Sequence, residues 1–220
     1  MKKILGIILI SIIALFVLDH ILVYYFVYDA TGGSLSNTDP GQQAAYDKAL
    51  TLIEKAKADN DISLSLSHSG LTQVPPEIGE LTSMEWLDLS NNALTALPPE
   101  IGELDSLKYL YLYDNAITSF PTDISELTSL VMLVLHENEL TSLPEEMANL
   151  TSLNQLYLND NKLKVLPQWI TQLDMEIVWE DKSYRGKGIN VYGNPLEEPP
   201  IEVVKQGKAA IKAWFDEKNK

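Results

Sequence analysis

The chain has no cysteine among its 220 residues, which excludes structural disulfides, cysteine-ligated zinc and thiol catalysis together. It has only three histidines, His20, His68 and His136, and they lie far apart in the sequence. The phosphate-binding pattern G-x-x-x-x-G-K-[ST] does not occur, and neither do the hydrolase patterns G-x-S-x-G and H-E-x-x-H. We therefore expect a protein that is not an enzyme and that has no cofactor, catalytic residues or metal site.

Positive charge is scarce in the middle of the chain. Between Asp61 and Asn161 there are sixteen acidic residues and one basic residue, Lys108, so this stretch accounts for the formal net charge of −15. Negative surfaces repel nucleic acid and anionic lipid, and they favour basic partners or divalent cations. We expect no nucleic-acid partner. A simpler explanation of the acidity is that it keeps an extended surface soluble.

What the chain does have is a period of 23 residues, and a fixed period in this range is typical of stacked repeat units. The unit Met84–Ser106 shows the pattern. In residues 86–90 the two leucines occupy alternate positions, as in a short strand with one buried face. Proline follows later in the unit, and Ile101 and Leu104 then suit a helical or 3₁₀ turn. An asparagine after each strand is expected to form a ladder that bonds unpaired backbone groups: Asn92, Asn115, Asn138, Asn161 and Asn194.

The pattern L-x-x-L-x-L-x-x-N-x-L-x-x-L-P-x-x-I-x-x-L-x-x resembles the leucine-rich repeat, in its 23-residue form with the LP signature. The ending YGNPLEEPPIEVVKQGKAAIKAWF is similar to the C-terminal cap of bacterial leucine-rich repeat proteins, including those joined to Roco-type GTPases. The resemblance covers residues 43–216. It implies an α/β fold: a right-handed solenoid with a curved parallel sheet on its concave face, helical or 3₁₀ turns on its convex face, and helical caps.

The repeat register divides the chain into consecutive parts. We expect a signal anchor, a transmembrane helix or a signal peptide over residues 1–30, a flexible linker over 31–41 and an N-terminal capping helix over 42–60. Five repeats occupy 61–175. Residues 176–220 hold an insertion (176–185), a sixth divergent repeat and a capping helix over 201–215.

The N-terminal apolar run indicates a membrane segment. Residues 4–28 would span about 37 Å as a helix, enough to cross a hydrocarbon core of about 30 Å. Their seventeen Ile, Leu, Val and Phe residues outweigh Asp19 and His20. Lys2 and Lys3 precede the run, so the positive-inside rule places the N-terminus in the cytoplasm of a bacterial-type cell and the repeats outside, on a single-pass membrane protein. The alternative is a cleaved signal and an exported soluble protein.

The outward strand positions gather aromatic residues, which are enriched where proteins contact their partners. An acidic row borders them at Asn91, Asp114, Glu137 and Asp160, whereas the carboxylates of the convex side suit a solvated face. Aromatic residues also suit exposed strands by propensity alone. The residues expected to contact a partner on the concave face are Trp86, Asp88, Tyr109, Tyr111, Tyr113, Met132, Val134, His136, Tyr157, Asn159 and Tyr192.

These observations favour a non-enzymatic module that binds a protein or peptide, preferably a basic one, through an aromatic and acidic concave face. The alternative is a cell-surface structural or adhesion scaffold that binds envelope glycans, since aromatic rings also stack on sugars. The sequence leaves the ligand and the oligomeric state open.

Overall fold

The computed structural model describes residues 39–179 and 187–220. The expected membrane segment at 4–28 therefore lies outside the described residues, as does most of the linker at 31–41. The chain divides into two units, residues 1–43 and 44–220. Every strand, 3₁₀ helix and C-terminal helix of the described residues lies in the second unit.

Short parallel strands form one sheet of seven, in the order β1-β2-β3-β4-β5-β7-β6. The register pairs residues one repeat apart, for example Leu87 with Leu110. The parallel sheet of a repeat solenoid is thus confirmed. The strands are β1 (Ser63–Ser65), β2 (Trp86–Asp88), β3 (Tyr109–Tyr111), β4 (Met132–Val134), β5 (Gln155–Tyr157), β6 (Ile177–Val178) and β7 (Gly188–Asn190).

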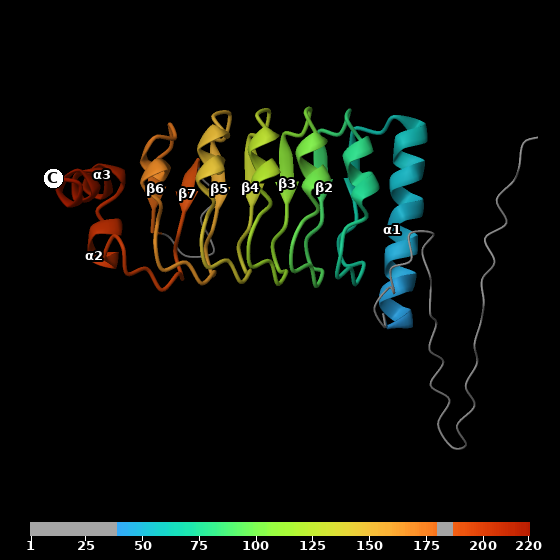
Figure 1. The fold of residues 1–220 in the computed structure, drawn as a ribbon, viewed down its shortest axis with the longest axis horizontal. Coiled ribbons are helices and arrows are strands. Elements are labelled where there is room, and N and C mark those ends of the chain that lie inside the picture. Colours follow the sequence, from blue (N-terminus) through green and yellow to red (C-terminus); the bar gives the residue numbers. More distant parts are fainter. Residues whose placement is uncertain (1–38, 180–186) are drawn as a thin grey trace, which may run out of the picture. The chain divides into compact units, whose positions relative to one another are not determined.

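A 3₁₀ helix follows each of the first five strands and lies on one side of the sheet, as Figure 1 shows. A proline precedes each of them, because its fixed φ holds the chain extended before the turn; Pro98, for example, has φ −69° and ψ 150°. The 3₁₀ helices are η1 (Pro76–Glu80), η2 (Pro99–Glu103), η3 (Thr122–Glu126), η4 (Glu145–Asn149) and η5 (Gln168–Thr171).

The core lies between the sheet and these 3₁₀ helices. The middle residue of each strand from β2 to β5 and the isoleucine or methionine of each facing 3₁₀ helix are fully buried, as Leu110 and Ile124 illustrate. At the N-terminal end, α1 (Pro40–Asp59) adds Ala49, Ile53 and Ala56 to this core. Asp39 accepts a hydrogen bond from the backbone N–H of Gly41 through Oδ1 at 3.0 Å, as an N-cap residue does.

Two features at the C-terminal end differ from the sequence expectation. The expected helix over 201–215 is two helices, α2 (Ile201–Val204) and α3 (Lys208–Lys218). Gly207 separates them, with a φ of +86° that only glycine adopts readily. Val204, Ile211 and Phe215 nevertheless bury their side chains in the core, as a cap requires.

The second difference is the insertion. The insertion interrupts the 23-residue period, but it also contains a strand. Its start forms β6, which pairs in parallel with β7. The later strand β7 lies between β5 and β6. The sixth repeat therefore stacks directly on the fifth, and the start of the insertion extends the sheet beyond it.

Candidate functional site

One face of the sheet is turned away from the 3₁₀ helices. In the three-residue strands its side chains come from the first and third residues and from the second residue after the strand. We call this surface the open sheet face. The strand register aligns its residues in rows. In one row Trp86 is followed by Tyr109, Met132 and Gln155, each paired with the residue before it. In the next row Asp88 is followed by Tyr111, Val134 and Tyr157.

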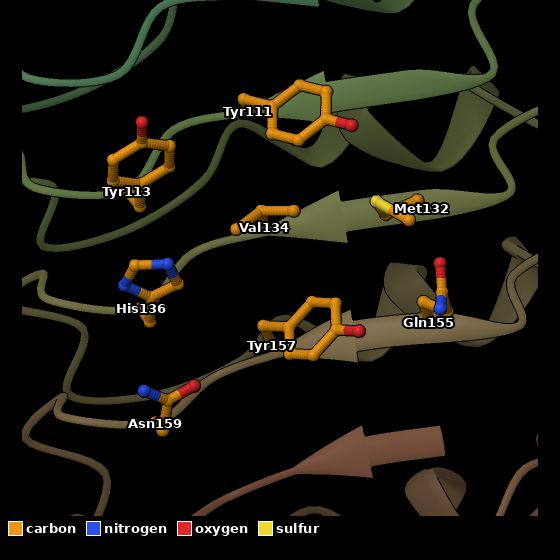
Figure 2. Close-up of a pocket in the computed structure, with 8 residues that line it drawn as sticks. All are labelled: Tyr111, Tyr113, Met132, Val134, His136, Gln155, Tyr157 and Asn159. Carbon is orange, nitrogen blue, oxygen red and sulfur yellow. The ribbon is translucent and has the colours of Figure 1, made fainter. Parts of the chain in front are cut away.

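A hollow of about 560 Å³ occupies the middle of the open sheet face. Figure 2 shows the side chains around it rising from three neighbouring strands, β3, β4 and β5, and from the residues just after them. Seven of the eight lining residues belong to the expected contact set. The eighth, Gln155, follows Met132 by one repeat, and that step is the signal that identifies it. The lining residues are Tyr111, Tyr113, Met132, Val134, His136, Gln155, Tyr157 and Asn159.

The aromatic rings of this face pack against one another. Tyr113 stacks on His136, with ring centroids 4.8 Å apart and planes inclined by 16°. Trp86 tilts against Tyr111 at 5.5 Å and 51°. Such pairs contribute about 0.5–1.5 kcal/mol beyond the area that they bury, so the rings are held in place before any partner arrives.

Burial divides the expected contact residues into two groups. Val134, Tyr157 and Asn159 are only 6%, 7% and 4% exposed, and their contact with a partner stays a prediction. They are the least exposed of the side chains that line the hollow. Tyr109 is the most open at 36%. The remaining members are partly exposed: Trp86, Asp88, Tyr111, Tyr113, Met132, His136 and Tyr192.

Asp88 has a local bonding role as well as its place on the open sheet face. Its Oδ1 accepts hydrogen bonds from the backbone N–H of Ser90 at 2.9 Å and from the Ser90 hydroxyl at 2.6 Å. Ser90 is fully buried, although the strand alternation gives it an outward position. Tyr192 lies outside the hollow, where its ring meets that of Trp179 edge-on at 5.4 Å.

The asparagines after the strands join each repeat to the one before it. Asn138 accepts a hydrogen bond from the Ile117 N–H at 3.0 Å, and its Nδ2 donates to the carbonyls of Leu112 and Leu135 at 2.9 and 3.1 Å. The same arrangement recurs at the other ladder positions, Asn92, Asn115, Asn161 and Asn194. This ladder fixes the spacing at which the strands carry the open sheet face.

Asn194 shows that the ladder passes over the insertion. Its Oδ1 accepts from Leu163, 31 residues earlier, where the preceding asparagine accepts from a residue 21 positions earlier. The excess of ten residues is the length of segment 176–185. The sixth repeat thus makes the same bonds to its neighbour as the others do.

The backbone conformation of the acidic row explains part of its residue choice. Asn91, Asp114, Glu137 and Asp160 have φ of 54°, 54°, 57° and 56°, in the left-handed region. Asparagine and aspartate tolerate this region better than most residues do. The repeated choice of Asx at three of these four positions therefore follows partly from the turn, whereas glutamate at position 137 does not.

Negative charge dominates both sides of the repeats. Lys108, the one basic residue between positions 61 and 161, pairs with Glu85 at 2.7 Å. On the side of the 3₁₀ helices, a second hollow of about 470 Å³ is lined largely by carboxylates, among them Glu100, Glu103 and Asp123. Over residues 39–179 and 187–220, no group of three or more His, Asp or Glu side chains has the arrangement of a metal site.

Displaced pKa values occur on α1, away from the open sheet face. Burial, and then the negative charges of Glu77 and Asp47, raise the pKa of the Tyr46 hydroxyl. A hydrogen bond to Asp59 and the charge of that carboxylate raise the pKa of Lys55. These shifts follow from local neighbours and do not indicate a catalytic group.

Within the described part of the chain, no helix is both long and apolar enough to cross a bilayer. The expected span at 4–28 falls before that part begins.

The repeats match known proteins. A family model for the leucine-rich repeat region matches residues 63–139 and 100–176, which together span more than half of the chain. A solved leucine-rich repeat protein of Leptospira interrogans is similar, with 39% sequence identity over 47% of this chain and a TM-score of 0.46. The match covers 26% of the Leptospira protein, so the chain spans about a quarter of its length. No curated protein sequence matches the chain.

Proposed function

Because the chain belongs to the leucine-rich repeat family, whose repeat regions are generally protein-interaction modules, we propose that it is a non-enzymatic module that binds a protein or peptide through its open sheet face. The observation that carries the proposal is the hollow over β3, β4 and β5. Tyrosine, histidine and methionine side chains line it, and ring packing already orders them. Rigid aromatic side chains give large contact area at a low entropy cost.

The packing of the rings favours a protein partner over an envelope glycan. A sugar that stacks needs an open ring face. One face of the Tyr113 ring is covered by His136, and Tyr157 is only 7% exposed. A hollow lined by tyrosine, methionine, valine and histidine side chains instead suits apolar side chains from a protein. Glycan binding is therefore the weaker alternative.

We further propose that the module is presented outside the cytoplasmic membrane of a bacterial-type cell. The support is the sequence of residues 4–28, with its seventeen large apolar side chains and the preceding Lys2 and Lys3. Protease treatment of intact cells tests this, with a tag after Lys220 as the reporter. Loss of the tag is expected, and a protected tag would overturn the proposed location.

Site-specific photo-crosslinking tests the binding surface. A photoreactive phenylalanine analogue at Tyr109, the most exposed aromatic residue of the open sheet face, is expected to capture a defined partner in the native cells. The matched control carries the analogue at Val165, which is 48% exposed but lies outside that face. Equal capture from both positions would show that the surface is not selective.

Alanine substitution gives a second readout. The variant with Trp86→Ala and Tyr111→Ala loses the tilted ring pair and is expected to lose the captured partner while keeping a cooperative thermal unfolding transition. If the folded double variant captures the same partner as strongly as the parent, the open sheet face is not the binding surface.

A further inference from the structure

Two kinds of side chain border each other across β3, β4 and β5. Tyr113, His136 and Asn159 line one end of the hollow. Each is followed directly by an acidic residue: Asp114, Glu137 and Asp160. The side chains are in contact at the last pair, where Asn159 Nδ2 donates to Asp160 Oδ2 at 3.0 Å. An apolar hollow thus has a line of three carboxylates along one edge.

The charge around this edge is one-sided. Asp114 is exposed and the other two acids are partly exposed. The lysine nearest in sequence, Lys162, pairs with Glu139, and Lys108 pairs with Glu85. Carboxylates at the rim of an interface select a partner of opposite sign and speed its approach. This edge therefore favours a segment that has basic side chains beside its apolar ones.

The spacing of the three acids discriminates between an α-helical and an extended conformation of the partner segment. Neighbouring strands lie about 4.8 Å apart, so Asp114 and Asp160 are separated by about 10 Å along the row. On an α-helix, residues i and i+7 lie on one side and are about 10.5 Å apart. On an extended chain, same-side residues i and i+4 are about 13 Å apart. The spacing of side chains on the helix matches the separation of Asp114 and Asp160 to within about 1 Å, whereas the spacing on an extended chain exceeds it by about 3 Å.

We propose that the partner segment is a basic amphipathic α-helix that lies across β3, β4 and β5. Its apolar stripe fills the hollow, and its lysine or arginine side chains, one turn apart, pair with Asp114, Glu137 and Asp160. This inference rests on the proposed function, because it identifies the occupant of the same open sheet face. The binding mode is that of a helix in a groove, with anchors at i, i+3 or i+4, and i+7.

Designed peptides test the conformation of the occupant. The first probe has leucines at i, i+3, i+4 and i+7, lysines on the adjacent stripe, and a lactam bridge on the far side that holds it helical. The second has the same composition with leucine and lysine alternating, so that it is amphipathic only when extended. Binding to the full chain in a neutral detergent is measured by fluorescence anisotropy. The helical probe is expected to bind at least tenfold more tightly, and equal or reversed affinity would overturn the inference.

Charge variants test the position of the helix. Asp114→Asn with Asp160→Asn keeps residues that tolerate a positive φ, as Asn91 does in the same row, and is expected to weaken the helical probe roughly tenfold. The matched control, Glu100→Gln with Asp123→Asn, removes the same charge from the side of the 3₁₀ helices and is expected to change binding less than twofold. Equal losses from both pairs would mean non-specific attraction and would overturn the inference.

The inference and the proposed function fail separately. If crosslinking at Tyr109 captures a protein partner but the helical probe has no advantage over the alternating one, the module binds proteins and the helical occupant is wrong. If Trp86→Ala with Tyr111→Ala leaves both partner capture and helical-probe binding unchanged, the open sheet face itself is wrong.

Discussion

The imidazole ring of His136 stacks on the phenol ring of Tyr113 with a centroid distance of 4.8 Å, and the two residues are 23 positions apart in the chain. Each ring belongs to a different repeat, so the pair links two units on the open sheet face as well as shaping the hollow. A surface ordered by contacts between repeats loses its shape if either repeat is disturbed.

A double-mutant cycle measures this link. We expect the coupling between Tyr113→Ala and His136→Ala in the free energy of unfolding to be about 0.5–1.5 kcal/mol, as for other stacked aromatic pairs. Urea unfolding of the four proteins of the cycle gives the value. Strict additivity of the two substitutions would show that the rings do not support each other.

The hydrogen bonds of the asparagine ladder predict a large loss of stability when a buried ladder residue is replaced. Asn138→Ala removes the partner of the Ile117 N–H and one of the two asparagine donors to each of the Leu112 and Leu135 carbonyls, which keep the neighbouring ladder asparagines. A buried backbone group without a partner costs about 1–3 kcal/mol, so we expect a loss of at least about 2 kcal/mol in urea unfolding. Asn149→Ala is the control, because Asn149 is exposed at the end of η4. A loss no larger than that of the control would contradict the structural role of the ladder.

The close packing of η2 against η3 predicts that a larger residue at Gly102 lowers the stability of the fold. A Cβ on Gly102 would lie 2.5 Å from the carbonyl oxygen of Asp123 on η3. We expect Gly102→Ala to lower the free energy of unfolding by about 1–3 kcal/mol, the range for overpacking. Two repeats later the same position is Ala148, and Ala148→Gly should cost only about 0.5–1 kcal/mol. Thermal unfolding compares them, and a neutral Gly102→Ala would mean that η2 and η3 can move apart at little cost.

The acidic row contains one substitution that should stabilise the protein. Glu137 has a φ of 57°, and a left-handed backbone costs a residue such as glutamate about 1–2 kcal/mol, but costs asparagine less. We expect Glu137→Asn to raise the free energy of unfolding by about 0.5–1 kcal/mol. Asp114→Asn controls for the lost charge, since aspartate already tolerates this backbone. Equal gains from both variants would assign the effect to charge instead of conformation.

The repeat period predicted most of the fold because it acts at two levels. The alternation within residues 86–90 indicates a strand, and the step of 23 residues aligns that strand with its neighbours. It could not predict β6, since the period breaks at the insertion and the pairing of Ile177 with Ile189 depends on a strand that comes later in the chain. It also missed the break at Gly207, where a single glycine allows a positive φ inside an otherwise helical pattern.

For the candidate site, the register predicted on which face of the sheet each side chain lies, but not how exposed that side chain is. It placed Tyr157 on the open sheet face, where the structure has it, but the period says nothing about how tall the neighbouring side chains are. Tyr157 lines the hollow with side chains from three strands, and it is only 7% exposed. The left-handed backbone at Asp114 is likewise a property of the turn that side-chain type alone suggests only weakly.

The ladder also has a direction. Each asparagine reaches back to backbone groups of the preceding repeat, as Asn161 does to Leu140 and Leu135. During synthesis the earlier repeat is the first to leave the ribosome, so its bonding groups are already present when the next asparagine emerges. The chain can then assemble in the order of its synthesis, and each completed repeat becomes the template on which the following one closes.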